Sequence, residues 1–469
     1  MAQRHMDRLS AVDTAFLEQE GDATHMHIGG IAIFAGPPPG IDAVMEHIRS
    51  RLHLVPRYRQ KLARPPLQSG RPVWIDDPHF NLAYHVRHTA LPAPGDEDRL
   101  RGLASRLFAQ RLDRTKPLWE IWVVEGLDGG RFALISKTHH ALVDGISGVD
   151  LVTALFDLTP EVRDEPPGEE WVPRPEPSQA QLLASAARGA VDRTLEVAGD
   201  TAGAVTSPQR ALGAVRSAIE GVGEVAWTGL NAPPPTPFNV PIGPHRRLVT
   251  VQASLADYKS IKNALGGTVN DVVLAVVAGG LRRFLGARGA PVDELELRAC
   301  VPVSVRTEAQ RGTLGNRLTQ ILAPLPVYVE DPVERLEVVR AAMDGLKESK
   351  QALGAETIAG MQGFAPPTIL AQASRLNFSN RFYNLLVTNI PGPQIPIYLL
   401  GRKLESLYPI PFLAGERALA IAIMSYDGAL DYGLLGDLDA LPDLDLLADG
   451  IEASADELLR AARRPAAKA

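Results

Sequence analysis

Hydrophobic and polar positions along the chain follow two periods, one typical of strands and one typical of helices. Residues 24–34 alternate and then become wholly apolar, which predicts a core strand, and apolar residues at helical spacing over 41–52 predict a helix after it. The same order recurs later: residues 248–254 alternate, and 268–285 carry a long apolar helical pattern with Thr268 as its cap. Strands and helices that alternate in both halves predict α/β layers rather than a helical bundle.

The same periods predict the remaining elements. The opening helix covers 9–16 with Ser10 as its cap, and the helix at 257–265 is closed by the glycine pair at 266–267. Further strands are predicted at 121–124, 132–135, 297–305, 316–322, 384–388 and 418–426, and further helices at 100–108, 146–158, 332–353 and 444–462.

Two proline-rich stretches divide the chain. Residues 159–177 are rich in Pro, Glu and Asp, and 231–237 contain four prolines, which is typical of stiff linkers. Small residues at helical spacing between them predict helices that pack on the protein or lie on a membrane surface; scarce large anchors and mixed charges favour packing. We therefore predict an N-terminal lobe over 1–165, linkers and small-residue helices over 166–240, and a C-terminal lobe over 241–469.

A short internal match supports two lobes. The predicted strand at 132–138 leads into Asp144 and Gly145, and the one at 418–425 leads into Asp427 and Gly428, so both approach an Asp-Gly pair.

Composition narrows the classes of protein. A formal net charge of −7 over 469 residues argues against a nucleic-acid binder, which needs a concentrated basic surface. The single cysteine, Cys300, lies in an apolar run, so we expect a buried structural thiol in a reducing, cytoplasmic compartment. No signal peptide is visible, and no stretch approaches the roughly 18 apolar residues of a spanning helix, so we expect any membrane contact to be peripheral.

Candidate chemistry lies where a predicted strand ends and a predicted helix begins. His139 and His140 occupy this junction, and adjacent side chains on a strand end point to opposite faces. An imidazole moves protons near neutral pH, because its reference pKa is about 6.5. We predict that His140 is the general base and that His139 holds the local backbone or packs beneath it.

The turn after the histidines carries two further candidates. Asp144 could hold the imidazole tautomer directly or could pin the loop by pairing with a distant arginine, and we prefer the second role. Gly145 would let the chain turn sharply and bring backbone N–H groups near a reacting oxygen.

Other interpretations of the histidines are weaker. A histidine pair is often an ordinary strand end, and the spacing lacks the i, i+4 histidines of zinc hydrolases, so we predict no metal. His25 and His27 share a strand face, but no third metal ligand is obvious nearby. The chain also lacks a nucleotide-binding glycine loop and a Gly-x-Ser-x-Gly nucleophile motif, which leaves direct transfer assisted by a base.

These motifs resemble those of the bacterial wax ester synthase/acyl-CoA:diacylglycerol acyltransferases, in the chloramphenicol-acetyltransferase-like superfamily. Residues 139–145 match the HHxxxDG signature, which condensation domains of peptide synthetases share. Further matches span nearly the whole chain in the expected order, at 9–16, 26–30, 117–120, 241–247, 270–275, 302–306, 314–316 and 388–393.

The resemblance implies two similar lobes, each a mixed sheet flanked by helices, with the active-site channel between them. His140 would remove the hydroxyl proton of the acceptor, so that its oxygen attacks the thioester of acyl-CoA without a covalent acyl-enzyme. Asn270 and the Gly145 backbone are candidate oxyanion donors by position, although Asn270 and Asp271 could equally only cap and brace their helix. Arg306 is the candidate partner of Asp144.

The resemblance also implies acyl-CoA as co-substrate, no cofactor, and diacylglycerol or a long-chain alcohol as acceptor, both of which present a hydroxyl on an apolar body. Arg246 and Arg247 are candidates to meet the phosphates of CoA. We expect peripheral contact with the inner membrane face or lipid droplets. Two alternatives stay open: a condensation-type enzyme that uses carrier-bound substrates, and a non-catalytic lipid-binding relative. The oligomeric state is left undetermined.

Overall fold

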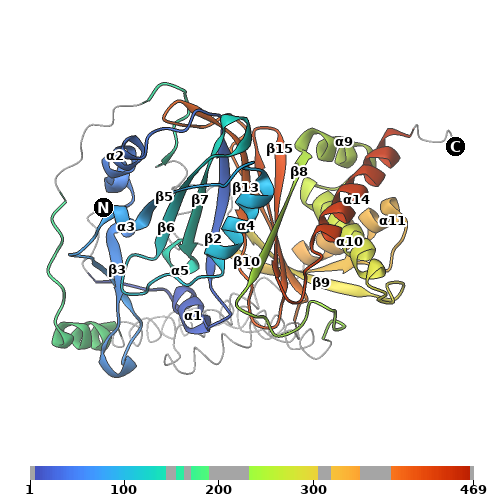
Figure 1. Ribbon diagram of the computed structural model, residues 1–469. Coiled ribbons are helices and arrows are strands. Elements are labelled where there is room, and N and C mark those ends of the chain that lie inside the picture. Colours follow the sequence, from blue (N-terminus) through green and yellow to red (C-terminus); the bar gives the residue numbers. More distant parts are fainter. Residues whose placement is uncertain are drawn as a thin grey trace.

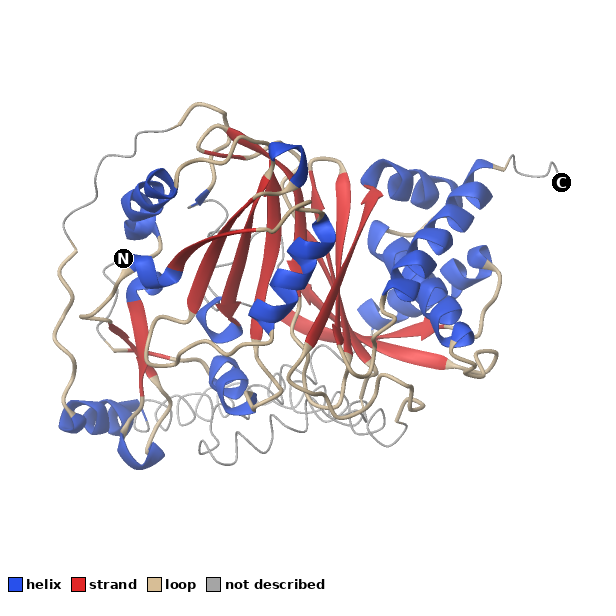
Figure 2. Cartoon of the chain, in the orientation of Figure 1, coloured by secondary structure: helices blue, strands red, loops and turns tan. Residues whose placement is uncertain are grey.

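The computed structural model describes residues 6–143, 155–162, 171–189, 232–304, 318–348 and 382–464. Two six-stranded sheets lie side by side in the middle of the molecule, and helices cover their outer faces (Figures 1 and 2). This arrangement confirms the predicted α/β class with two lobes.

The N-terminal sheet has the strand order β12-β13-β2-β7-β6-β5. Its strands are β2 (His27–Phe34), β5 (Val86–Ala90), β6 (Trp119–Glu125), β7 (Phe132–His139), β12 (Tyr398–Leu399) and β13 (Arg402–Ile410). A small sheet of the order β1-β4-β3 lies beside it, made of β1 (Asp7–Arg8), β3 (Gln60–Ala63) and β4 (Val73–Asp76). The helices of this lobe are α1 (Ala11–Gln19), α2 (Ile41–Arg51), α3 (Leu82–His85), α4 (Glu97–Phe108) and α5 (His140–Val143), with 3-10 turns at Leu52–Leu54, Pro56–Arg59, Pro66–Gln68 and Asp128–Gly130.

The C-terminal sheet has the strand order β10-β9-β11-β14-β15-β8. Its strands are β8 (Arg246–Ser254), β9 (Glu296–Ser304), β10 (Leu318–Pro326), β11 (Leu385–Pro391), β14 (Leu419–Tyr426) and β15 (Ala429–Asp437). Four helices pack on its outer face: α9 (Leu255–Leu265), α10 (Val269–Ala287), α11 (Pro332–Glu348) and α14 (Asp445–Arg463). The middle of α10 is fully buried, which explains why its sequence is apolar on all sides.

Strand β13 joins the two lobes. It comes from the predicted C-terminal lobe, yet it pairs antiparallel with β2 of the N-terminal sheet and packs against β14 and β15. Gly433 of β15 lies so close to β13 that an added Cβ would be 1.7 Å from the carbonyl oxygen of Pro409, so a side chain at this position would displace the strand. The predicted division at residue 241 assigned β13 to the C-terminal lobe only. Its pairing with the edge of β2 could not be predicted, because the two strands lie far apart in the sequence.

Each face of the N-terminal sheet has its own core. Alternate residues of β2 and β7, such as Phe34 and Phe132, pack under α2, whereas Ile33 and Ile135 face α4 and the C-terminal sheet. The second core continues across the lobes to Leu435 and other residues of the C-terminal sheet. The two lobes therefore share one apolar contact layer.

Local signals predicted helix ends well. The side chain of Ser10 accepts a hydrogen bond from the amide of Asp13 at the start of α1, and Gly266 ends α9 with a φ of 88°. Both agree with the expected capping chemistry.

Two predicted features need correction. Asp427 and Gly428 form the two-residue turn of the β14–β15 hairpin, with φ of 42° and 87°, whereas β7 leads into a helix, so the apparent repeat joins different structures. Strands β13 and β15 were not predicted at all. The predicted helix at 146–158 lies largely outside the described residues, as does most of 178–230, of which a helix at 179–189 is described.

Among the described residues, no single helix combines the length and apolar composition of a membrane span. The pair α9 and α10 meets both criteria jointly, but the two helices are bent by 100° relative to each other.

Candidate active site

The two predicted catalytic histidines lie where β7 ends and α5 begins. The amide of His139 donates to the carbonyl oxygen of Leu118 at 3.0 Å, and the amide of His140 donates to that of Met26 at 2.8 Å. His139 also pairs with His27 across the β2–β7 ladder. Sheet hydrogen bonds on both sides therefore fix the backbone from which both imidazoles project.

The ring of His140 lies between two aromatic side chains. It stacks on Phe16 of α1, with ring centroids 3.9 Å apart and planes at 24°, and it meets Phe412 edge-on at 5.7 Å. Phe412 follows β13, and Leu386 of β11 packs against the same apolar cluster. His140 thus lies where α1, the segment after β13 and the C-terminal sheet meet, which agrees with a site between the lobes.

His139 is fully buried, and its ring has a defined tautomer. The amide of Ala141 donates to Nδ1 of His139 at 3.1 Å, so Nδ1 is unprotonated and the neutral ring carries its proton on Nε2. Nε2 points to the carboxylate of Glu20, 3.6 Å from Oε2. Burial lowers the pKa of His139 despite the nearby carboxylate, which favours the neutral ring at neutral pH.

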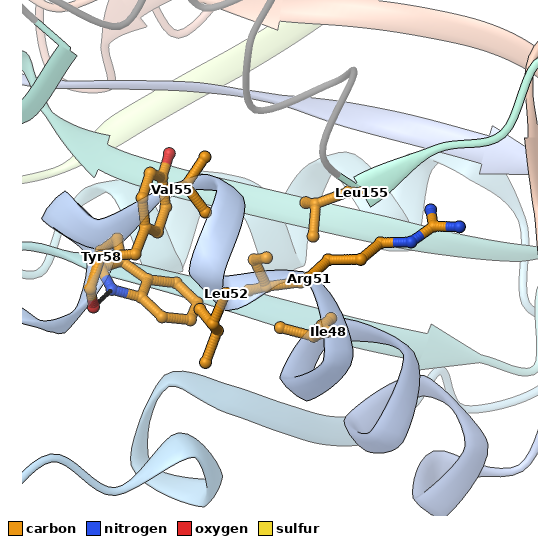
Figure 3. Close-up of a pocket in the computed structure, with 8 residues that line it drawn as sticks. Ile48, Arg51, Leu52, Val55, Tyr58 and Leu155 are labelled. Atoms are coloured by element: carbon orange, nitrogen blue, oxygen red, sulfur yellow. Dashed lines mark hydrogen bonds between the residues drawn. The ribbon is translucent and has the colours of Figure 1, made fainter. Parts of the chain in front are cut away.

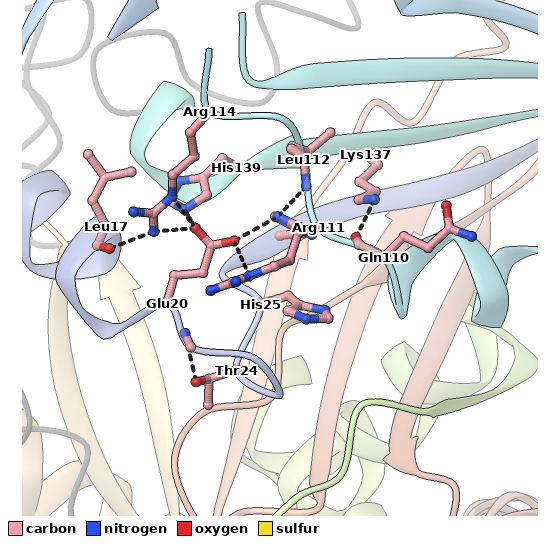
Figure 4. Close-up of polar contacts among 12 residues, drawn as sticks. Leu17, Glu20, Thr24, His25, Gln110, Arg111, Leu112, Arg114, Lys137 and His139 are labelled. Carbon is pink, nitrogen blue, oxygen red and sulfur yellow. Dashed lines mark hydrogen bonds and ion pairs between the residues drawn. The ribbon is translucent and has the colours of Figure 1, made fainter. Parts of the chain in front are cut away.

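Glu20 is the charged centre behind the histidine pair (Figure 4). Its side chain is 1% exposed, and Arg114 donates to Oε2 from Nε at 2.7 Å and from a terminal nitrogen. Nε2 of His27 lies 3.5 Å from Oε1, and Nε of Arg111 lies 3.8 Å from it. Burial alone would raise the pKa of the Glu20 carboxyl, but the two histidines and Arg114 hold it well below its usual range.

The sequence prediction missed Phe16, Phe412, Glu20 and Arg114 as parts of this site. One signal was present: Glu20 follows the last residue of α1, where a carboxylate is disfavoured by the helix dipole and therefore needs a cationic partner. The partner could not be named, because Arg114 is 94 residues away. Trp119 of β6 is buried in the core beside β7.

Asn270 and Asp271 begin α10. Asp271 is 1% exposed and completes a capping box, in which it accepts from the amide of Thr268 at 2.7 Å while its own amide donates to the Thr268 hydroxyl. The sequence left open whether Asp271 is catalytic or braces its helix, and this capping geometry is that of a residue that braces the helix.

Oδ1 of Asn270 accepts from Nδ2 of Asn389 at 3.3 Å. Alternation along β11 places Asn389 with Val387 on the helix-covered face of the sheet, whereas Leu386 contacts the cluster around His140 from the other face. The contact thus ties the start of α10 to β11.

Three predicted site residues, Asp144, Gly145 and Arg306, lie outside the described residues. The two arginines considered for the CoA phosphates have protein partners. Arg246 is 5% exposed and donates to the carbonyl oxygens of Gly243 and Ala23, while Arg247 pairs with Asp445. Arg246 therefore links the lobes, because Ala23 belongs to the N-terminal one, and it does not present a free guanidinium.

The pocket in Figure 3 lies on the other face of the N-terminal sheet, under α2, and has a volume of only about 10 Å³. Its walls are apolar except for Arg51, which pairs with the buried carboxylate of Asp157 at 2.6 Å. Trp119 and Ile121 line it from the face of β6 that packs under α2, whereas His139 faces Glu20 and Arg114. This pocket is a packing gap of the core rather than part of the histidine site.

Comparisons with known proteins agree with this geometry. Residues 9–273 match the model of the wax ester synthase/diacylglycerol acyltransferase catalytic domain, and residues 314–459 match that of the WS/DGAT C-terminal domain. Two proteins of Mycobacterium tuberculosis named probable diacylglycerol O-acyltransferases are 32% and 34% identical over 463 and 465 residues, covering 98% and 97% of this chain and 97% and 99% of their own.

Solved structures give the same result. The wax ester synthase/diacylglycerol acyltransferase from Marinobacter aquaeolei VT8 matches with a TM-score of 0.70 and 27% identity, over 97% of this chain and 99% of its own. The first condensation domain of the calcium-dependent antibiotic synthetase shares the fold with a TM-score of 0.58 at 18% identity, over 100% of this chain and 98% of its own.

Two lobes with paired histidines at their contact define a two-lobed acyltransferase of the chloramphenicol-acetyltransferase-like fold. Within that class, the chain belongs to the wax ester synthase/diacylglycerol acyltransferase family.

Proposed function

We propose that this protein transfers a long-chain acyl group from acyl-CoA to the hydroxyl of diacylglycerol, forming triacylglycerol, and that it also accepts long-chain alcohols. The observation that carries the proposal is the histidine pair at the lobe contact in a chain whose full-length relatives are named diacylglycerol O-acyltransferases. The same base would serve both acceptors, because each presents a hydroxyl on an apolar body.

In the proposed reaction, His140 takes the proton of the acceptor hydroxyl as its oxygen forms a bond to the thioester carbonyl carbon. The tetrahedral intermediate then collapses, the carbon–sulfur bond breaks, and the proton passes from His140 to the departing thiolate of CoA. No acyl-enzyme forms, and the reaction needs no bound cofactor. The apolar neighbours Phe16 and Phe412 support this role, because they shield one side of the imidazole from water.

The remaining predicted residues have proposed supporting roles. We assign Gly145 to the backbone that stabilises the oxyanion, and Asp144 to a structural pair with Arg306. The capping box supports a bracing role for Asp271, and the contact with Asn389 supports a positioning role for Asn270.

The test is to incubate the purified protein with palmitoyl-CoA and either dipalmitoylglycerol or hexadecanol, and to identify the lipid products. Tripalmitoylglycerol supports the proposal, and palmityl palmitate from the second reaction supports the wider acceptor range. If neither product forms, the proposal is overturned, and the condensation-type or lipid-binding alternative is favoured.

We also propose that the protein works at a lipid surface, on the cytoplasmic face of the membrane or on lipid droplets, because its substrate and product partition into lipid. Leu67 supports this: it is 98% exposed, at the tip of a turn with a φ of 55°. Gly70, after this turn, lies against Ala186 of the helix at 179–189, which exposes 42% of Leu183. Two exposed leucines on neighbouring elements are suited to shallow insertion.

Sedimentation with phosphatidylcholine–diacylglycerol vesicles tests this surface. Leu67→Asp should weaken vesicle binding, whereas Leu438→Asp, which changes an exposed leucine of the C-terminal lobe, should not. Equal binding by both variants would refute the assigned surface.

A further inference from the structure

We propose that Glu20 is a positioning residue for acyl transfer, because it holds His139 in the orientation that fixes the first turn of α5, on which His140 stands. The inference rests on the proposed role of His140. Glu20 lies outside the histidine motif, and it acts through His139 without touching substrate.

The first step of the argument is the tautomer of His139. Its Nδ1 accepts from the amide of Ala141, the second residue of α5. In the opposite tautomer, or with the ring protonated, two N–H groups would face each other and this contact would be lost. Helix α5 would then lose one of the bonds that hold its first turn.

The second step is the charge that faces the other ring nitrogen. At 3.6 Å, the separation of Nε2 and the Glu20 carboxylate is longer than a direct hydrogen bond, so the contact is an electrostatic one between the N–H group and the anion. Both groups are 1% exposed, where such a contact is poorly screened by water. The carboxylate therefore favours the proton on Nε2, which is the state that Ala141 requires.

The third step is the rigidity of Glu20 itself. Arg114 binds the carboxylate and also donates to the carbonyl oxygen of Leu17 at 2.7 Å, which ties it to the last turn of α1. Phe16, in the same turn, stacks on His140. The end of α1 thus contacts both histidines, one through an apolar face and one through a charge.

A simpler role for Glu20 would be charge balance for the cations around it. Arg114 and Arg111 follow α4 and Lys137 lies on β7, whereas His27 on β2 is kept neutral by burial. A role limited to charge balance would change the stability of the fold, but it would not act specifically on turnover through His139.

The kinetic test compares Glu20→Gln with the control Glu18→Gln, which makes the same change two residues earlier, in the last turn of α1, where Glu18 pairs with Arg64. With palmitoyl-CoA and dipalmitoylglycerol, Glu20→Gln should lower kcat about 10- to 100-fold and leave KM within about twofold. Glu20→Asp, which keeps the charge, should recover part of the lost kcat. Equal kcat in Glu20→Gln and Glu18→Gln would overturn the proposal.

A double-mutant cycle tests whether Glu20 acts through His139. If it does, Glu20→Gln should have little further effect on kcat in a His139→Gln background. If the fold-losses in kcat of the two single variants multiply in the double variant, Glu20 does not act through His139.

A spectroscopic measurement separates this inference from the proposed function. Nitrogen-15 spectra of the histidine rings in the full chain, assigned with His139→Gln, should show His139 protonated on Nε2 only, and mixed tautomers in Glu20→Gln. A wild-type His139 protonated on Nδ1 would refute the inference, as would an unchanged tautomer in Glu20→Gln. The result does not depend on whether the protein turns over acyl-CoA.

Discussion

The imidazole of His140 stacks on the ring of Phe16, with centroids 3.9 Å apart. Phe16 precedes His140 by more than a hundred residues and belongs to the first long helix of the chain, so this contact joins the opening of the sequence to its histidine motif. A flat neighbour restricts rotation of the imidazole and excludes water from one of its faces.

Loss of this stack should slow the reaction. Phe16→Leu keeps an apolar side chain but removes the flat surface, so kcat should fall about 3- to 10-fold with little change in KM. Phe80→Leu, which removes a comparable stack on His85 at 5.3 Å, is the matched control and should keep normal turnover. Steady-state kinetics would decide, and equal rates in the two variants would count against the contact.

Removal of the base should have the largest effect. His140→Ala should lower kcat about 100- to 10,000-fold while circular dichroism stays unchanged, because the side chain supplies proton transfer. His88→Ala, which removes a half-exposed imidazole paired with Glu125, should retain activity. A fully active His140→Ala protein would rule out the proposed mechanism.

Asp271 should matter for stability rather than turnover. Asp271→Ala breaks the capping box with Thr268 and should lower the free energy of unfolding by about 1–2 kcal/mol, because donors at the start of α10 lose their acceptor. Urea unfolding measures the loss, and the kcat of the folded fraction should be normal. A selective loss of kcat would instead assign Asp271 to the catalytic machinery.

Acid should destabilise the fold through buried histidines. Burial lowers the pKa of His27 to about 3, whereas an unfolded histidine titrates near 6.5. The stability due to neutral His27 is therefore fully present above about pH 6.5 and is lost as pH falls from there toward 3, with a slope of up to about 1.4 kcal/mol per pH unit. Urea unfolding between about pH 7.5 and 4.5 should show this slope, and His27→Gln should reduce it. An equal slope in the variant would mean that other groups cause the loss.

Asp431 offers a test of the contact between the lobes. Its buried carboxylate accepts from the amide of Leu407 and from Gln252, each at 2.8 Å, and burial raises its pKa. In Asp431→Asn, the amide oxygen can still accept from Leu407, and the Gln252 amide can turn its oxygen toward the new NH2 group. Because burial disfavours the charged form, this variant should be about 1 kcal/mol more stable at pH 7, whereas Asp431→Ala should be less stable by about 1–3 kcal/mol. Thermal unfolding compares them, and equal losses in both variants would show that the charge is required.

Local chemistry determined much of this structure. The strand and helix periods predicted the α/β layers, Ser10 and Thr268 capped the helices that they were expected to cap, and the wholly apolar pattern of α10 became a buried helix. Such features depend on neighbours within a few residues, and the sequence contains those neighbours.

The prediction of sheet partners was incomplete for a physical reason. β13 alternates poorly and contains Pro409, so its sequence does not mark a strand, and only its pairing with the edge of β2 defines it as one. Asp427 and Gly428 are suited to the tight turn of a hairpin, which they form between β14 and β15. The sequence comparison matched them with the Asp-Gly pair after β7, because two residues alone do not specify whether a strand or a helix follows.

The sequence by itself determined the family, the histidine pair, and the interpretation of His140 as the base. Only the tertiary structure decided what surrounds that base: Phe16 and Phe412 against its ring, and Glu20 with Arg114 behind His139. These contacts join segments that lie far apart along the chain, and tertiary packing within the N-terminal lobe and against the segment after β13, rather than any local pattern, brings them together.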